Sequence, residues 1–273
     1  IAQLCPSSLF ATAILPGLLL AGLYIGYAIT RAYFNPSIAP KPPEEEIPPR
    51  AVILKEVLVS FLPLFSLIIL VLGTILGGLA TPAEAAGVGA FGAIVLSYFY
   101  KTLKWKNFKE SVFLTAKTTA MIMWLFIGSW TFSSVFSYLG GHEVFEHFFK
   151  AMDLAPWQFL VITQIIIFLL GWPLEWTEIL IIFVPIFLPL VEFFGVNPYF
   201  FAMLIALNLQ TSFLTPPMAM SAYYLKGVQS KNVELMDIFR GIMPFLGIVI
   251  FAMVLMYLFP GIALWLPDVL FAN

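Results

Sequence analysis

Charged residues are scarce in this sequence. Asp, Glu, Lys and Arg together make up 10% of the 273 residues, whereas hydrophobic residues make up 61%. A typical globular domain carries about 25% charged residues. A soluble protein of this length could not bury so much apolar surface, so the lipid bilayer must be its solvent. The net charge of −2 is also too small to indicate a nucleic-acid partner.

Cysteine and histidine are nearly absent. The single Cys5 excludes an internal disulfide framework. The two histidines, His142 and His147, are five positions apart, whereas a helical zinc pair needs a spacing of about four. We interpret the two histidines as residues at the membrane interface rather than as metal ligands. We therefore expect no transition-metal site.

The residue patterns of an enzyme are also missing. The sequence contains no Ser/His/Asp arrangement, phosphate-binding loop or pair of acid/base carboxylates, and its three arginines lie at the ends of apolar runs. We therefore expect no catalytic residues and no organic cofactor. The chain starts at Ile1 without a recognisable signal peptide. Either its start was processed or it is a piece of a longer protein.

Long apolar runs indicate an all-α polytopic membrane protein. Two short runs, 157–171 and 177–191, are either two full crossings or one re-entrant hairpin. Length favours the hairpin, because about 15–17 residues span roughly 22–25 Å, less than the ~30 Å hydrocarbon core. The predicted parts are 1–30, a transmembrane segment; 31–55, a Pro/Glu-rich cytoplasmic linker; 56–110, two transmembrane helices with a TPAEAA motif; 111–155, a transmembrane helix plus an interfacial helix; 156–228, the hairpin and a broken helix; and 229–273, a C-terminal transmembrane helix.

Basic residues indicate the orientation of these segments. The loops 31–55, 101–109 and 226–240 hold most of the Lys and Arg, so the positive-inside rule predicts that they are cytoplasmic. The loop 139–155 is slightly acidic and is predicted to be external. Within it, five apolar side chains share one helical face, as in a helix that lies in the membrane interface. They are Val144, Phe145, Phe148, Phe149 and Met152.

The stretch NLQTSFLTPP, residues 208–217, places polar residues and a helix breaker inside an apolar run. Because Pro216 and Pro217 have no N–H, carbonyls one turn upstream, around Ser212, lose their helical partners. Free carbonyls and nearby hydroxyls are hard oxygen ligands that suit a small cation such as Na⁺. The alternative is a proline kink whose carbonyls are satisfied by the hydroxyls. These hydroxyls belong to Thr211, Ser212 and Thr215.

The stretch GWPLEWTEI, residues 171–179, carries two carboxylates between apolar runs. A charge inside the bilayer costs at least about 3 kcal/mol and suggests a functional site. If 157–191 is a hairpin, Glu175 and Thr177 lie at its tip. Alternatively, Glu175 and Glu178 are solvated in an ordinary loop whose tryptophans anchor the interface.

A third motif, GGLATPAEAAGVGAFGA, covers residues 77–93. Thr81 and Pro82 are typical of an N-cap and a first helical position, and the helix dipole favours Glu84 in the first turn. The glycines and alanines permit close helix packing. A structural role for this motif is favoured over a role in binding.

Several of these motifs together resemble the large membrane subunit (DctM-like M subunit) of the tripartite ATP-independent periplasmic (TRAP) transporters. The resemblance covers nearly the whole chain, with the motifs in the same order. The matching stretches are LFATAILPGLLLAGLYIGY at 9–27, ATPAEAAGVGA at 80–90, LLGWPLEWTEILIIFVPIFLPLV at 169–191, NLQTSFLTPPMAMSAYYLKGV at 208–228 and DIFRGIMPF at 237–245.

The resemblance implies an ion-transporter elevator-type fold with two inverted repeats, each supplying a re-entrant hairpin and a broken helix around one Na⁺ site. Here 157–191 would be the second hairpin, with Glu175 at the position of the family's tip carboxylate, commonly Asp. The segment 199–226 would be the second broken helix, and the first repeat would lie before Ile1. The implied Na⁺-binding residues are Glu175, Thr177, Thr211, Ser212, Thr215, Pro216 and Pro217.

The implied function is symport in the bacterial or archaeal cytoplasmic (inner) membrane. Na⁺ would be the coupling ion for the import of organic acids such as C4-dicarboxylates. The implied partners are a periplasmic solute-binding protein and the small TRAP membrane subunit. Ser212 and Ala219 depart from the family, because many members have Gly at both positions. The residues that would bind substrate stay unknown, and a channel-like or an assembly/scaffold subunit is the alternative function.

Overall fold

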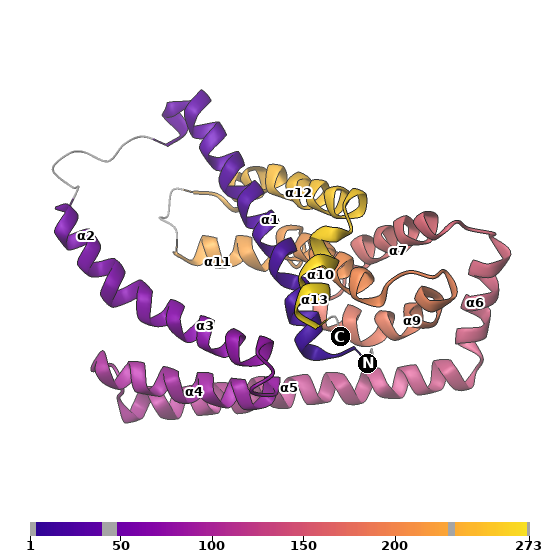
Figure 1. Ribbon diagram of the computed structural model, residues 1–273, viewed down its shortest axis with the longest axis horizontal. Coiled ribbons are helices and arrows are strands. Elements are labelled where there is room, and N and C mark those ends of the chain that lie inside the picture. Colours follow the sequence, from indigo (N-terminus) through magenta and orange to yellow (C-terminus); the bar gives the residue numbers. More distant parts are fainter. Residues whose placement is uncertain (1–3, 40–47, 229–232, 272–273) are drawn as a thin grey trace. The chain divides into compact units, whose positions relative to one another are not determined.

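The structure, a computed structural model, describes residues 4–39, 48–228 and 233–271, and every regular element in these ranges is helical (Figure 1). Six of the helical segments are long and apolar enough to cross a membrane. The prediction of an all-α polytopic membrane protein is therefore confirmed. The six segments are Pro6–Phe34, Arg50–Leu76, Pro82–Phe99, Trp105–Tyr138, Trp176–Phe193 and Leu235–Leu258.

The chain divides into two compact units. The N-terminal unit consists mainly of Gly26–Thr119, and the C-terminal unit mainly of Thr12–Ile25 and the residues from Ala120 onward. Helices α1 (Pro6–Phe34) and α5 (Trp105–Tyr138) contribute to both units. The two units are described separately below.

In the N-terminal unit, α3 packs antiparallel against α4. A Cβ atom on Gly92 would lie 2.4 Å from Leu67 Cδ1, and one on Gly89 would lie 3.0 Å from a methyl group of Val71. These two glycines therefore let the helices approach closely. The elements are α2 (Arg50–Glu56), η3 (Val57–Phe61, a π-helical turn), α3 (Leu62–Leu76) and α4 (Pro82–Phe99).

Two π-helical turns share a physical cause, because each ends two residues before a proline. The turn η3 precedes Pro63, and the turn η4 (Ile179–Phe183) precedes Pro185. Proline has no N–H to donate to the carbonyl four residues earlier, and a local widening of the helix accommodates the loss. In η3 the carbonyl freed by Pro63 belongs to Val59, and it accepts a hydrogen bond from the Tyr100 hydroxyl.

In the C-terminal unit, α10 is the central helix and contacts α7, α9, α11, α12 and α13 (Figure 1). Ten of its 17 residues are buried, whereas an isolated membrane helix would expose its side chains to lipid. The elements of this part are α7 (Pro156–Leu170), α8 (Trp176–Glu178), α9 (Val184–Phe193), α10 (Pro198–Leu214), α11 (Met220–Val228), α12 (Leu235–Leu258) and α13 (Gly261–Phe271).

Helices α7 and α10 run parallel, as three contacts between them show: the contacts follow the same order along both helices. The first is an aromatic stack with ring centroids 6.1 Å apart, and the other two are hydrogen bonds. The C-terminal ends of both helices therefore lie at the same level. From the first contact to the last, the pairs are Phe159 with Phe201, Gln164 with Asn208, and Gly171 with Ser212.

The helix bounds differ from the predicted segments at two places. The linker predicted in 31–55 is shorter, since α1 continues to Phe34 and α2 begins at Arg50. Its Pro/Glu-rich centre, 40–47, lies outside the described residues. The C-terminal part holds two helices, because Pro260 cannot continue α12, and α13 follows as a separate helix.

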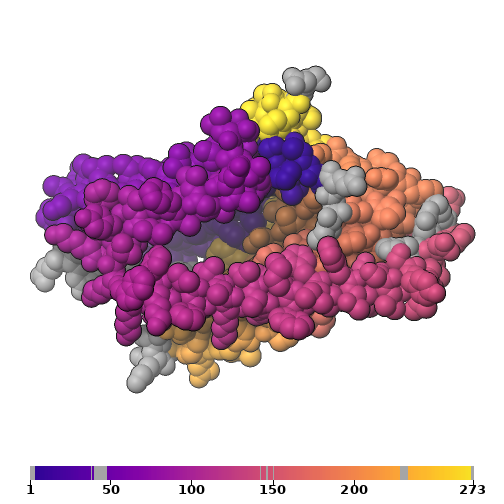
Figure 2. Space-filling model, turned by 90° about the horizontal axis from the view of Figure 1, so that it is seen from below, coloured from indigo at the N-terminus to yellow at the C-terminus, as the bar shows by residue number. Residues whose placement is uncertain are grey.

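Helix α5 is 34 residues long, and Ser129 is its one buried residue. Figure 2 shows its side chains, in magenta, on the surface along the helix. It is followed by α6 (Gly141–Ala151), which lies where the interfacial helix was predicted. Phe149 of α6 is 1% exposed and packs edge-to-face on Phe159 of α7, with ring centroids 5.8 Å apart.

Candidate functional site

The helical break predicted in 208–217 lies after Leu214, at the end of α10. Thr215 is extended, with φ −103° and ψ 137°, and the cis Pro216–Pro217 bond follows before α11 begins at Met220. Thr211 and Ser212 therefore belong to the last turn of α10 rather than to the break itself. The carbonyls of Ser212 and its neighbour Phe213 have prolines four residues on, so neither has a helical N–H partner.

The three hydroxyls of this stretch are buried but make different hydrogen bonds. Thr211 Oγ1 donates to the Asn208 carbonyl at 2.6 Å, and Thr215 Oγ1 donates to the Thr211 carbonyl at 2.9 Å. Both bonds are local to the last turns of α10, and neither acceptor is one of the carbonyls that the prolines free. Ser212 Oγ instead donates to the Gly171 carbonyl at 2.7 Å, 41 positions away in the sequence. Ser212 thus links the break to the end of α7.

The segment between the two short apolar runs forms a turn between α7 and α8. Gly171 is the C-cap of α7, and Glu175 is the N-cap of α8. The Glu175 N–H donates to Glu178 Oε2 at 3.0 Å, so one of the two carboxylates caps the helix start. Thr177 Oγ1 is buried and has no hydrogen-bond partner among the described residues. An unpaired buried hydroxyl is costly and suggests a missing partner.

The turn and the break meet at a small cavity. Its volume is about 10 Å³, close to the space that a single water molecule occupies. The structure thus brings together Glu175 and Ser212, which were predicted from separate motifs. Thr177, Thr211 and Thr215 do not line the cavity, and Pro216 and Pro217 are exposed. The lining residues are Glu175, Trp176, Ser212, Phe213, Met218 and Met220.

A polar pair in the middle of α7 and α10 was not predicted as part of a site. Asn208 is 2% exposed, and its Nδ2 donates to the Gln164 carbonyl at 2.7 Å and to Gln164 Oε1 at 2.9 Å. Gln164 Nε2 is buried without a partner among the described residues. Both side chains line an apolar groove of about 350 Å³ between α7, α10 and α12. The sequence did contain one indication of this pair, because Gln164 places an amide side chain inside the apolar run 159–170.

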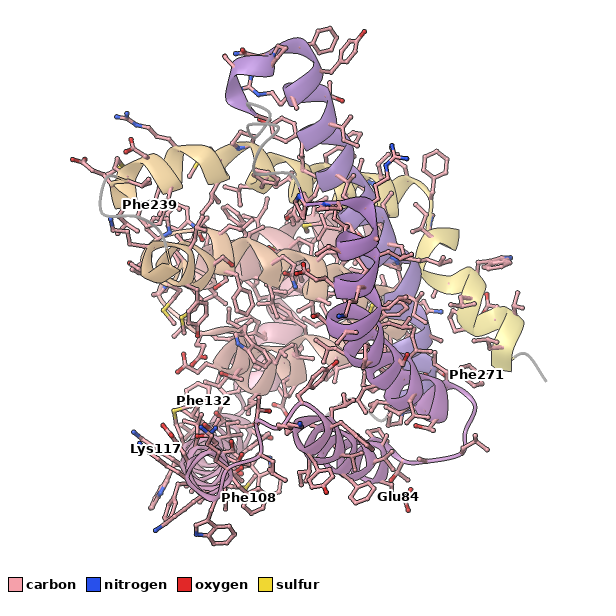
Figure 3. All side chains as sticks on the ribbon, turned by 90° about the vertical axis from the view of Figure 1, so that its left-hand side faces the viewer. Glu84, Phe108, Lys117, Phe132, Phe239 and Phe271 are labelled. Carbon is pink, nitrogen blue, oxygen red and sulfur yellow. The ribbon has the colours of Figure 1, made fainter. Side chains whose placement is uncertain are left out.

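The TPAEAA motif belongs to the N-terminal unit and makes a capping box. The Thr81 N–H donates to Glu84 Oε2 at 2.7 Å, and the Glu84 N–H donates to Thr81 Oγ1 at 3.3 Å. Pro82 occupies the first turn of α4. Figure 3 labels Glu84, whose carboxylate also accepts a hydrogen bond from Thr81 Oγ1 at 2.8 Å. The interactions of these three residues are those of a helix start.

Comparison with known proteins gives consistent similarities. A family model described as "Tripartite ATP-independent periplasmic transporter, DctM component" matches residues 2–262. The chain is 26% identical over 263 residues to the C4-dicarboxylate TRAP transporter large permease protein DctM of Rhodobacter capsulatus, covering 96% of this chain and 58% of that protein. It is 29% identical over 210 residues to the sialic acid TRAP transporter large permease protein SiaM of Vibrio cholerae, covering 77% and 48%.

A third relative has the name DctMQ. It is the isethionate TRAP transporter permease protein DctMQ of Oleidesulfovibrio alaskensis, 25% identical over 198 residues, with 72% of this chain and 31% of that protein covered. The chain spans about half the length of the DctM and SiaM relatives that it matches.

Proposed function

The chain belongs to the DctM component of the tripartite ATP-independent periplasmic transporters, and we propose that it forms the part of a large permease subunit that couples Na⁺ to the import of an organic acid. The family consists of transporter permeases rather than enzymes, and the chain is a multi-pass protein of the bacterial inner membrane. Its relatives are named for C4-dicarboxylates, sialic acid and isethionate, all organic anions. We extend this class to the present chain without choosing one member.

The single observation that carries the ion site is the hydrogen bond from Ser212 Oγ to the Gly171 carbonyl, beside a cavity that Glu175 also lines. A cavity of about 10 Å³ is too small for an organic acid but fits one water-sized guest. A half-buried carboxylate next to it favours a cation. The guest that these features suit is therefore a small cation such as Na⁺.

The C-terminal ends of α7 and α10 also favour a positively charged guest. Because α7 and α10 run parallel, both direct their C-terminal carbonyls toward the level of Gly171 and Ser212. Each helix C-terminus carries the equivalent of about half a negative charge. Two such ends next to Glu175 raise the affinity for a cation, and broken helices at mid-membrane are a known device for this purpose.

The residues at this junction fit Na⁺ by the chemistry of their donors. The proline-freed carbonyls of Ser212 and Phe213, the Gly171 carbonyl and the Glu175 carboxylate are all hard oxygen donors. Thr177 Oγ1 has no partner among the described residues but does not line the cavity, so it would have to turn toward the ion to become a further ligand. When bound, Na⁺ would supply a positive charge to balance the Glu175 carboxylate. Thr211 and Thr215 would hold the last turn of α10 in shape through their backbone hydrogen bonds.

We further propose that α7 to α9 form a hairpin, even though Trp176–Phe193 is by itself long enough to cross a membrane, and that this hairpin and the break form one of two inverted repeats of an elevator-type transporter. The relatives are about twice as long as the matched segment, which leaves room for a second copy of this arrangement. The description "tripartite" supports a periplasmic solute-binding protein and a small membrane subunit as partners. The solute would then be selected largely by the binding protein.

Uptake measurements with the complete subunit and its partners in proteoliposomes test the proposal. We expect uptake that saturates with solute, requires the binding protein and follows the Na⁺ gradient. A channel would conduct without saturation and without the binding protein. A scaffold subunit would leave uptake unchanged when the break is mutated. Saturable uptake with no dependence on Na⁺ would overturn the coupling while leaving the transport function in place.

The orientation is proposed from the loop charges and is tested by labelling. With Cys5 replaced, a single cysteine at position 104 should stay unlabelled by an impermeant thiol reagent added to whole cells. A cysteine at position 147 should be labelled under the same conditions. Labelling at position 104 from outside would reverse the proposed orientation.

A further inference from the structure

The start of α5 carries an excess of positive charge, although Glu110 lies four residues after Lys106 on nearly the same side of the helix. Residues 101–117 contain five lysines and one acidic residue, Glu110. Among the described residues, no carboxylate lies within salt-bridge distance of Lys106, Lys109 or Lys117. We call these three residues of α5 the lysine stripe. It is separate from the junction of turn and break described above, and nothing below depends on the coupling ion.

The lysine stripe occupies one face of its helix. At about 100° per residue, its three lysines fall within an arc of about 80°. Phe113 lies in the same arc, and Lys109 Nζ stands 5.7 Å from the centre of its ring. All four side chains are exposed. In Figure 3, which views α5 along its axis, Lys117 and Phe108 lie on different sides of the helix.

The length of α5 locates the lysine stripe relative to the bilayer. Thirty-four residues make a helix of about 51 Å, whereas the hydrocarbon core is ~30 Å thick. The uncharged run 118–138 spans about 31 Å and fills that core by itself. Lys117 then stands at the headgroup level, and the turns that bear Lys109 and Lys106 continue from it toward the water. Trp105 and Phe108, stacked with ring centroids 5.8 Å apart, add the aromatic residues typical of that depth.

We propose that the lysine stripe binds the headgroup of an anionic phospholipid. The phosphate would lie beside Lys117, the lysine nearest the uncharged run, while Lys109 and Lys106 extend the positive field outward along the same face. The acyl chains would lie against the apolar surface that follows Lys117 along the helix. A lipid matches this pattern better than an acidic protein segment does, because charge passes directly into exposed apolar surface along one face of a helix. Basic clusters immediately outside a membrane crossing attract anionic lipid in this way.

Native mass spectrometry of the complete subunit tests the proposal by counting bound lipids. The detergent-solubilised protein is titrated with phosphatidylglycerol or with phosphatidylcholine. We expect phosphatidylglycerol to bind more tightly, and added salt to weaken the difference. The combined change Lys106→Gln, Lys109→Gln and Lys117→Gln should lower the affinity for phosphatidylglycerol about tenfold or more, because one lysine near an anionic surface contributes about fivefold.

Two controls separate the lysine stripe from a general loss of charge or fold. Lys55→Gln removes an exposed lysine from α2 of the same unit and should leave the lipid preference unchanged. Replacing the three lysines by arginine keeps the charge and should keep the preference. Both sets should elute from size exclusion like the parent protein.

Three results would overturn the proposal. The first is equal affinity of the parent protein for the two lipids. The second is an equal loss in Lys55→Gln and in the triple glutamine variant. The third is a triple variant that keeps its lipid preference but no longer co-purifies with the small membrane subunit, which would make this face a protein-docking surface.

Discussion

Helices α5 and α10 are both apolar and both carry hydroxyl residues, but they use them differently. In α5 the hydroxyls of Ser111, Thr115 and Thr131 donate to carbonyls four residues earlier in the same helix, at 2.8–2.9 Å. In α10 the Ser212 hydroxyl crosses to the Gly171 carbonyl of another element. A hydroxyl inside a membrane helix is normally satisfied by its own backbone. A hydroxyl that bonds to another element therefore indicates a contact between elements, which the number of hydroxyls in a helix does not.

The same comparison separates the residues of the break that bond only to their own helix from those that reach another element. Thr211 and Thr215 behave like the α5 hydroxyls, since each donates to its own helix. What α5 lacks is a proline: α5 runs unbroken for 34 residues, whereas Pro216 and Pro217 end α10. The proposed ion site thus depends mainly on backbone carbonyls, Ser212 and Glu175. The following changes test that division, from the largest expected effect to the smallest.

Glu175→Gln is expected to have the largest effect on uptake. It removes the negative charge beside the junction cavity, and we expect the Na⁺ concentration for half-maximal uptake to rise by about tenfold to a hundredfold. Initial rates in proteoliposomes measure this. The matched control is Glu192→Gln, which changes an exposed carboxylate at the end of α9. Equal uptake by the two variants, at equal membrane abundance, would show that Glu175 is only a capped loop residue.

Pro216→Ala is expected to raise the Na⁺ requirement by about tenfold. Alanine restores an N–H that can pair with the Ser212 carbonyl, and a recaptured carbonyl is lost to the ion. One hydrogen bond of about 1–1.5 kcal/mol corresponds to roughly that factor. Pro244→Ala, which also restores an N–H but in the interior of α12, is the control. If the two alanine variants respond alike to Na⁺, the prolines at 216 and 217 only bend the chain.

Ser212→Ala tests the contact between the elements through stability. It leaves the Gly171 carbonyl without its buried donor, and we expect a loss of about 1–2 kcal/mol in the free energy of unfolding. Ser111→Ala in α5 removes a hydroxyl that only bonds its own helix, and it should change stability by less than about 0.5 kcal/mol. Thermal unfolding in detergent measures both. A Ser212→Ala variant as stable as Ser111→Ala would mean that this hydrogen bond does not hold the turn to α10.

Local features of the fold were predictable from the sequence because their causes are local. Two consecutive prolines end α10 wherever it packs, since neither has an N–H. Thr81 and Glu84 form a capping box within one turn. Glycines in α4 predicted close packing, although the partner of Gly92, Leu67 of α3, was not predicted.

Contacts between distant residues were not predictable in this way. Gln164 with Asn208, and Gly171 with Ser212, are separated by 44 and 41 positions. Their pairing requires α7 and α10 to run parallel in one register, which no periodicity within either helix specifies. The three hydroxyls could not be told apart for the same reason: the sequence suggested them equally, whereas in the structure only Ser212 of the three bonds to another element.

The central claim is that backbone carbonyls at a proline break, with hydroxyls as helpers, hold the coupling ion. Its most direct test is the initial uptake rate against Na⁺ concentration for Thr215→Ala, with the complete subunit and its partners in proteoliposomes and Thr131→Ala of α5 as the control. We predict that Thr215→Ala raises the half-maximal Na⁺ concentration about threefold, as expected for one weakened hydrogen bond. The maximal rate and the solute affinity of the binding protein should be retained. Wild-type Na⁺ curves for both Thr215→Ala and Pro216→Ala would contradict the claim and leave the break as a kink.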